Sequence, residues 1–310
     1  MKKATTISLV VLLLLAILVP IGCISIPTGS KIAVISLSGT ISGAGSTLFF
    51  GSTITSELVG EQLDKAEKDM SVKAVVLRIE SPGGAVAPCQ EILEQMGRVK
   101  EKKPIVVSMG NMAASGGYYI SAKANKIVAL PGTLTGSIGV ISEVPNVKGL
   151  YEKLGIEMQT FKGGKYKDMY SGLRELTPEE KEIMQQMTDE YYEQFVEVVA
   201  EGRGLSQDEV RSLATGQLYT GAQAKELGLV DELGGLDTAI GLAAQLANVE
   251  TWQVEYYKPK PTLLESLLGM NLGSLVEAVQ LKFLGLSGED IILLQTLSHT
   301  YPQPQYLYLI

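Results

Sequence analysis

The sequence predicts an α/β fold built on a mostly parallel sheet, and two observations support that prediction. First, apolar strand-like runs alternate with amphipathic helical stretches through the first half of the chain. This alternation is typical of parallel strands joined by right-handed helical crossovers. Second, glycine-containing motifs directly follow several of the strand-like runs, which is where α/β folds place their functional sites.

The expected strands are short runs rich in Val and Ile, at residues 31–37, 74–79, 104–109 and 126–130. Helical segments at about 54–69 and 86–102 have apolar residues spaced three and four positions apart. The second half is more helical. Capping boxes at 177–180 and 206–209 predict two helices, and 236–248 has the pattern of a third.

Composition excludes several functional classes. Hydrophobic residues make up 45% of the 310-residue chain and charged residues 19%, which describes a globular protein with a sizeable core. The net charge of −8, without a basic cluster, argues against nucleic-acid binding. Two cysteines are too few for a disulfide framework, and the lack of a Cys/His cluster excludes the usual zinc sites.

The N-terminus predicts attachment to a membrane. Lys2 and Lys3 precede an uncharged apolar run from Ile7 to Ile26, which is long enough to span a hydrocarbon core of roughly 30 Å. The run exceeds the usual length of a cleavable signal sequence, so a retained anchor is expected, with the lysines cytoplasmic and the rest of the chain outside. A competing interpretation is a lipidated Cys23 at the end of a lipobox-like stretch.

Ser115 is the candidate nucleophile. It lies in the segment AASGGYYIS, where small residues and two glycines leave its hydroxyl accessible to a substrate backbone. The chain contains a single histidine, His299, close to its C-terminus. A Ser-His-Asp triad is therefore a poor fit, and a lysine with a pKa below its reference value of about 10.4 is the better base. The alternative is that the small residues serve only close packing of a helix on the sheet.

Two further glycine motifs follow predicted strands. Ser81-Pro82-Gly83-Gly84 can present backbone N–H groups to the anionic oxygen of a tetrahedral intermediate, as an oxyanion hole does. Ser137, in the segment TLTGSIGV, can hydrogen-bond a catalytic lysine and orient it. Either motif alone is equally explained by a tight turn. Three lysines, Lys162, Lys165 and Lys167, lie in a glycine-rich run, and the local sequence does not separate them.

Taken together, these motifs resemble those of the signal peptide peptidase A (protease IV) family of membrane-bound serine proteases. The resemblance covers about Lys31 to Asn248, in the order and spacing of the motifs as well as in the motifs themselves. They are SPGG, SMGNMAASGGYYIS, TLTGSIGV, GGKYKDM and GLVDELGG. The length corresponds to the short form of the family, with one catalytic core.

The resemblance implies a role for each matched residue. Ser115 matches the nucleophile, and Lys167 matches the general-base lysine in GKYKDM. Ser137 matches the serine that holds that lysine. Gly84, with Gly83 beside it, matches the glycine whose amide helps form the oxyanion hole, to which the Gly116 amide adds a second donor. The family needs no metal or cofactor.

The resemblance also implies a fold and a setting. The family has a crotonase-like α/β core related to the caseinolytic protease fold. It forms a dome-shaped homo-oligomer on the outer face of a membrane, with dyads completed between neighbouring subunits. Its substrates are signal peptides and other extended apolar peptides. Three parts are expected: an anchor and linker at 1–30, a Ser/Lys peptidase domain at 31–250, and an extension of unknown role at 251–310, which opens with a strand-like piece.

Two other functions compete with a peptidase. A crotonase-type enzyme would act on acyl thioesters with SPGG as its oxyanion hole, although thioesters of coenzyme A are intracellular and the anchor predicts an outward-facing domain. A non-catalytic membrane scaffold would have kept the fold and lost activity. The presence of both Ser115 and Lys167 favours the peptidase.

Overall fold

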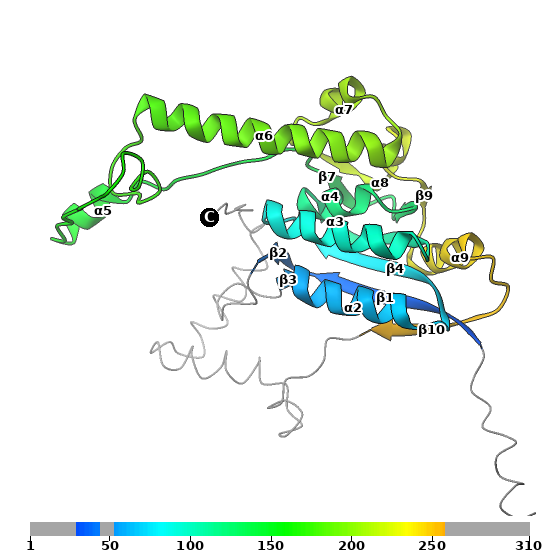
Figure 1. The fold of residues 1–310 in the computed structure, drawn as a ribbon. Helices are drawn as coiled ribbons and strands as arrows, with labels where there is room; N and C mark the ends of the chain where they lie inside the picture. The colour runs from blue at the N-terminus through cyan, green and yellow to red at the C-terminus, as the bar shows by residue number, and fades with distance from the viewer. Residues whose placement is uncertain (1–28, 44–52, 258–310) are drawn as a thin grey trace, which may run out of the picture.

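The computed structural model describes residues 29–43 and 53–257, and Figure 1 shows the arrangement of its elements. Within these residues the core is an eight-stranded sheet. Along its main path the strands follow the order β10 (Trp252–Tyr257), β1 (Ser30–Ser38), β4 (Val72–Ser81), β5 (Ile105–Ala114), β6 (Lys126–Ala129) and β9 (Glu232–Leu233). All pairings on this path are parallel, so the predicted α/β class and the four predicted strands are confirmed.

The sheet forks at β5. The first half of β5 pairs with β6, and its last three residues pair in parallel with β7 (Leu134–Gly136). On its other side β7 pairs antiparallel with β8 (Leu218–Thr220). The sequence analysis predicted no strand at 134–136, because three residues are too few to show a periodicity. The fork brings the ends of β5 and β7 side by side.

The helices predicted from periodicity and capping are confirmed. They are α2 (Ser56–Lys68), α3 (Val86–Lys100), α6 (Pro178–Arg203), α7 (Gln207–Leu213) and α9 (Leu236–Leu246). Both capping boxes form as expected, at the starts of α6 and α7. Helix α4 (Gly116–Ala122) follows Ser115 directly, as the glycine motif predicted. The short helices α5 (Lys148–Lys153) and α8 (Gly221–Glu226) were not predicted, and a separate small sheet joins β2 (Thr40–Ser42) to β3 (Thr53–Thr55).

The two faces of the sheet carry separate cores, because alternate residues of a strand point to opposite sides. Ala33, Ile35 and Leu37 of β1 join the buried faces of α2, α3, α4 and α6. Ile32 and Val34 of the same strand face the other way and pack with α9. Burial on both faces explains why the strands appear in the sequence as almost continuous apolar runs.

The structure describes the expected C-terminal end of the peptidase domain but not the expected anchor or tail. Strand β10 pairs with β1 along its whole length, so the sheet continues past residue 250, where the expected peptidase domain ends. The apolar tail from 262 and the anchor expected at 7–26 lie outside the described residues. In residues 29–43 and 53–257 no helix combines the length and the apolar character needed to cross a bilayer.

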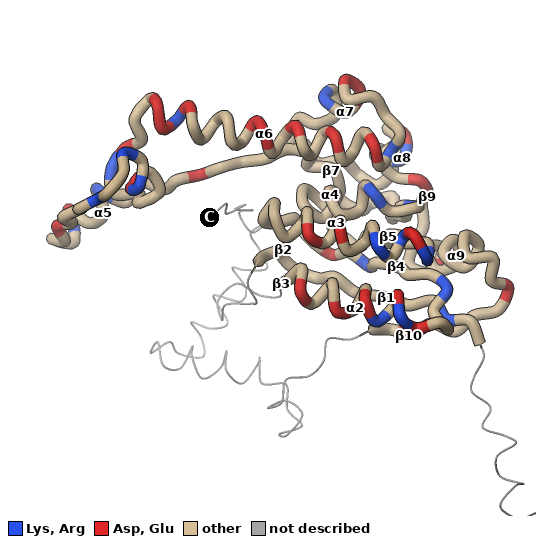
Figure 2. The backbone as a smooth tube through the Cα atoms, viewed as in Figure 1, with Lys and Arg blue, Asp and Glu red and all other residues tan. Residues whose placement is uncertain are grey.

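Residues 141–177 form an arm that extends away from the sheet and carries α5 (Figure 1). Helix α6 begins at the far end of the arm and returns to the core, where Phe195, Val196 and Val199 are buried. Figure 2 shows that acidic and basic residues are interleaved along the arm and the first turns of α6. The fold therefore consists of a packed core and a projecting, highly charged arm.

We predict that Ile92→Ala lowers the free energy of unfolding by about 2–5 kcal/mol, because it opens a cavity under α3. Ile92 is 0% exposed, whereas Met70, in the turn before β4, is 81% exposed. Met70→Ala is the matched control and should stay within about 0.5 kcal/mol of the wild type. Denaturant unfolding measures both. Equal effects of the two variants would contradict the assignment of Ile92 to the core.

Candidate active site

Ser115 stands at the tip of β5 in a strained conformation. Its φ of 50° and ψ of −120° lie outside the regions that L-residues ordinarily occupy. Its N–H donates to the Gly136 carbonyl at 2.8 Å, and its own carbonyl accepts the Tyr119 N–H at 2.8 Å. These two bonds hold the strand-to-helix turn on both sides. Such strain persists only where the surroundings fix it, and it is concentrated at functional sites.

Ser137 stands in the equivalent place at the tip of β7. Ala114 lies opposite Gly136 in the parallel pairing, so the residues that follow each of them leave the sheet as neighbours. Ser137 has the same φ of 50°, and its N–H donates to the Gln217 carbonyl at 2.8 Å. Both serines line one pocket, together with Tyr192 of α6. The structure thus brings together two residues that the sequence could assign only separately.

The SPGG motif packs directly against Ser115. Gly83 has a φ of 114°, and a Cβ on it would lie 2.7 Å from the Gly116 nitrogen and 2.8 Å from the Ser115 Cβ. Gly84 forms an isolated parallel bridge with Ile41, in which Ile41 N–H donates to Gly83 and Ala85 N–H donates to Ile41. The amide of Gly84 itself therefore points away from β2.

The amides of Gly84 and Gly116 are close to each other and to the serine. The Gly84 nitrogen lies 3.0 Å from the place that a Cβ on Gly116 would occupy. Gly116 is the first residue of α4, so its N–H has no acceptor within that helix. An oxyanion hole requires backbone donors next to the nucleophile, and these two amides lie next to Ser115.

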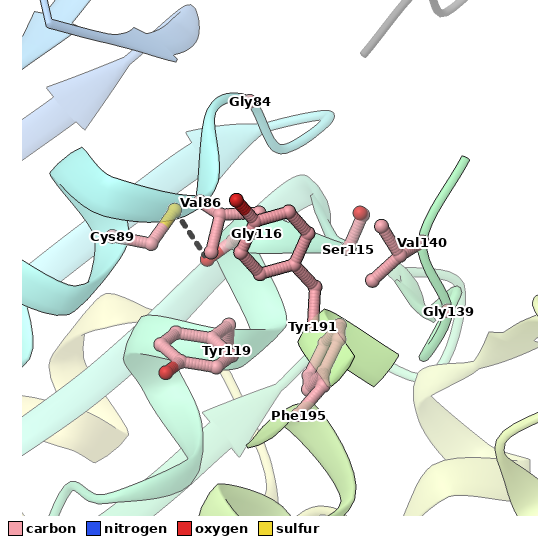
Figure 3. A pocket seen from close by; sticks show the side chains of 10 residues that line it. All are labelled: Gly84, Val86, Cys89, Ser115, Gly116, Tyr119, Gly139, Val140, Tyr191 and Phe195. Atoms are coloured by element: carbon pink, nitrogen blue, oxygen red, sulfur yellow. Dashed lines mark hydrogen bonds between the residues drawn. The ribbon is translucent and has the colours of Figure 1, made fainter. Parts of the chain in front are cut away.

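A small, mostly apolar pocket opens beside Ser115, as Figure 3 shows. Tyr119 and Phe195 form part of its wall and meet edge to face, with ring centroids 5.1 Å apart. The other residues that line it are Gly84, Val86, Cys89, Ser115, Gly116, Gly139, Val140 and Tyr191. The surface next to the Ser115 hydroxyl is therefore mostly apolar.

Cys89 is the other nucleophile-type side chain in this pocket, and it does not compete with Ser115. The residue is 2% exposed, and its Sγ lies 3.9 Å from the Gly116 carbonyl oxygen, the contact drawn in Figure 3. Burial raises the pKa of the Cys89 thiol to about 12. The thiol therefore stays protonated at neutral pH, where only the thiolate would be reactive.

Lys167 lies on the arm and is exposed. It is absent from the linings of both pockets that contain Ser115, and those linings include no other lysine. Figure 1 shows the arm, in green, projecting well away from the ends of β5 and β7. The structure therefore brings Ser115, Ser137, Gly83, Gly84 and Gly116 together, and it leaves Lys167 apart from them within one chain.

The ion pairs of the arm separate the three candidate lysines, which the sequence could not do. Lys162 Nζ lies 2.6 Å from the Asp168 carboxylate, and Lys165 pairs with Glu179 on the first turn of α6. The described residues form no ion pair with Lys167. No group of three or more His, Cys, Asp or Glu side chains within 29–43 and 53–257 is arranged to hold a metal ion.

Comparison with known proteins identifies the family. The model of peptidase family S49 matches residues 97–250, and that of Clp protease matches residues 46–135. The chain is 39% identical over 245 residues to a putative signal peptide peptidase SppA of Enterococcus faecium, covering 78% of this chain and 71% of that protein. It is 44% identical over 208 residues to the putative protease slr0021 of Synechocystis, covering 66% and 75%.

The chain belongs to peptidase family S49. It is a serine peptidase of the signal peptide peptidase A group, with a Clp protease-like α/β core. It is also 38% identical over 258 residues to Protease 4 of Salmonella typhi. The aligned region covers 82% of this chain and 41% of that protein. The chain therefore spans less than half the length of that relative.

We predict that Gly83→Ala lowers kcat/KM for a peptide substrate by about 10²–10³, the usual cost of disturbing an oxyanion hole. The added Cβ would press on Gly116 and Ser115, and a positive φ disfavours any L-residue. Gly132→Ala is the matched control, because a Cβ there meets nothing within 4 Å. Thermal unfolding should confirm that both variants fold. Wild-type kcat/KM in Gly83→Ala would contradict the proximity of Gly83 to the reacting atoms.

Proposed function

We propose that this S49 peptidase uses Ser115 as nucleophile and Lys167 as general base to cut extended, apolar peptides at a membrane. Signal peptides left after secretion are the substrate class. The observation that carries the proposal is the strained Ser115, flanked by the Gly84 and Gly116 amides and by an apolar pocket. We assign these functions to a peptidase domain at 31–250, extended by β10 to Tyr257.

Lys167 is the best base among the lysines of the described residues. A lysine that pairs with a carboxylate is held in its charged form, and a charged lysine cannot accept a proton. Lys162 and Lys165 are paired in this way, and the hydrogen bond to Glu179 raises the pKa of Lys165. Burial lowers the pKa of Lys100 and of Lys103, but both ammonium groups donate to backbone carbonyls away from the Ser115 pockets.

The reaction follows from these assignments. The Lys167 amine takes the Ser115 Oγ proton as the oxygen attacks the peptide carbonyl carbon. The amides of Gly84 and Gly116 hold the resulting oxyanion. The lysine ammonium then gives its proton to the leaving amine as the peptide bond breaks. Water repeats the sequence on the acyl-enzyme, releasing the carboxylate product and restoring both residues. Ser137, beside Ser115, is the hydrogen-bond partner for the amine.

The dyad is proposed to form between neighbouring copies of the chain. Lys167 lies on a projecting arm, and the arm exposes a series of large apolar side chains that the core does not cover. Leu150, Leu154, Ile156, Met158 and Phe161 are all exposed, and Phe161 is 91% exposed. An arm of this kind fits a surface that is buried in a homo-oligomer. Each arm would deliver Lys167 to the Ser115 pocket of the next subunit.

The membrane setting rests on the N-terminal sequence. The uncharged run at 7–26 is proposed to anchor the chain, with the peptidase domain on the outer side. The name of the Enterococcus faecium relative, a putative signal peptide peptidase, supports the same substrate class. An apolar pocket and a tethered site both suit short hydrophobic peptides.

We predict that the full chain cleaves a synthetic signal peptide and that Ser115→Ala, Lys167→Ala and Lys167→Arg each abolish cleavage. The first variant removes the nucleophile, and the other two remove a base that can be neutral near pH 7. Mass spectrometry of the peptide products measures the outcome, with Lys165→Ala as the matched lysine control. Cleavage by Ser115→Ala would overturn the nucleophile. A wild-type protein that does not cleave the peptide but binds acyl-coenzyme A would favour the thioesterase function. A wild-type protein that neither cleaves the peptide nor reacts with serine-directed probes would favour the scaffold function.

A mixing experiment tests the shared dyad. Neither Ser115→Ala nor Lys167→Ala should cleave the peptide alone, but co-assembly of the two should restore about a quarter of the wild-type activity. That fraction is expected because random mixing places an intact serine beside an intact lysine at roughly one interface in four. Co-expression followed by activity measurement and sizing tests this. Inactive mixed oligomers would show that both residues must come from the same chain.

A further inference from the structure

Arg174 holds two carboxylates of the folded arm, those of Asp168 and Glu180. Its Nε and one Nη donate to the Asp168 carboxylate at 3.0 and 2.7 Å. Its two Nη atoms donate to the Glu180 carboxylate at 2.7 and 2.6 Å. Both contacts are bidentate, a geometry that a planar guanidinium provides and an ammonium does not. Asp168 directly follows Lys167 in the sequence, and Glu180 is in the first turn of α6.

These pairs are sheltered from water. The side chains of Asp168 and Glu180 are 14% and 3% exposed, and that of Arg174 is 32% exposed. Asp168 also accepts a hydrogen bond from Lys162, and Glu180 accepts one from the Thr177 N–H at 2.9 Å. The hydrogen bonds from Arg174 are the largest cause that lowers the pKa of each carboxyl, that of Glu180 to about 2. Both carboxyl groups are thus ionised at neutral pH, and their oxygen atoms already accept hydrogen bonds from Arg174.

Other charged groups around this cluster come from α5, from the loop that follows it and from the start of α6, and the exposed Glu175 directly follows Arg174. Lys148, Glu152 and Glu157 line the same hollow as Asp168 and Arg174, and Lys148 pairs with Glu152 at 3.7 Å. On α6, Glu179 accepts hydrogen bonds from Lys165 and Tyr166. Glu157 is exposed. Asp168, which directly follows Lys167, and Glu179 and Glu180, which begin α6, are each held by a cation other than Lys167.

We propose that Arg174 is a positioning residue for Lys167: by holding Asp168 and Glu180, it keeps both carboxylates from pairing with the Lys167 ammonium. This inference rests on the proposed role of Lys167 as base. A carboxylate within about 4–6 Å favours the charged form of a lysine and raises its pKa by roughly 1–3 units. By holding these carboxylates, Arg174 leaves the Lys167 amine available to the Ser115 hydroxyl.

The test is the pH dependence of kcat/KM for signal-peptide cleavage by the full-length protein. In Arg174→Gln, Asp168 loses both hydrogen bonds from Arg174 and keeps the one from Lys162, so its carboxylate can also interact with Lys167 and should raise the apparent pKa of the base by about one unit. That shift lowers kcat/KM about tenfold at pH values below the wild-type pKa. The double variant Arg174→Gln/Asp168→Asn has the net charge of the wild type, and its apparent pKa should return to the wild-type value.

A matched control removes a guanidinium elsewhere. Arg211 pairs with Glu193 of α6 at 2.7 Å and with Asp208 of α7 at 3.1 Å, where the helices cross near the core. Arg211→Gln makes the same change in net charge, and it should leave the apparent pKa unchanged. An equal shift in Arg211→Gln would overturn the local role of Arg174.

The outcomes separate three explanations. A lower rate at every pH, with an unchanged apparent pKa in Arg174→Gln, would mean that Arg174 only stabilises the arm, and would overturn the proposal. Activity in Lys167→Ala would instead overturn the base assignment itself. If Arg174→Gln does not fold, the Asp168→Asn variant alone tests the proposal. The proposal expects the apparent pKa of the base in this variant to be at or below the wild-type value. A higher apparent pKa would contradict the proposal.

Discussion

The parallel pairing of β7 with the last three residues of β5 is the contact on which the site depends. It brings Gly136 beside Ala114, and the Ser115 N–H is then fixed on the Gly136 carbonyl. That hydrogen bond holds a non-glycine residue at a φ that it would not otherwise adopt. Gly83 can approach Ser115 closely because it has no Cβ. The serine, its two candidate amide donors and its apolar pocket all follow from this junction.

The core of the fold could be predicted from the sequence because its signals are local. Strands buried on both faces must be apolar throughout, and the boxes at Thr177 and Ser206 mark helix starts by their own hydrogen bonds. Strand β7 has only three residues, and helix α5 has no buried residues, so neither leaves a periodic pattern. The anchor at 7–26 and the tail from 262 belong to sequence outside the described residues and remain predictions.

The candidate site was predictable to the extent that its residues act through the backbone. The family resemblance implied that Gly83, Gly84 and Gly116 lie near Ser115, and all three lie there, where the close approach of their backbone leaves no room for a Cβ. The position of Lys167 was not predictable in the same way. Its separation from Ser115 in the sequence is compatible with a dyad inside one chain or between two. Lys162 pairs with Asp168 within the arm and Lys165 pairs with Glu179 of α6, and only the folded arm reveals these ion pairs.

The ionised carboxylates of the arm stabilise its folded form as the pH rises, which is also the direction in which a lysine becomes a better base. Glu180 has a pKa of about 2, below its ordinary value of 4.5. A carboxyl with a lowered pKa stabilises the folded state above its unfolded pKa, and the contribution is lost as the pH falls toward the folded pKa. The Arg174 cluster is therefore complete from weakly acidic pH upward. A neutral amine becomes more abundant in the same direction, so the proposed catalytic form and the ordered arm coexist. Among the described residues of one chain, no lysine lines the two pockets that contain Ser115, and a serine hydroxyl without a base is a weak nucleophile. If the dyad is shared as proposed, activity arises only where an ordered arm meets a neighbouring core, and proteolysis is then confined to the assembled enzyme.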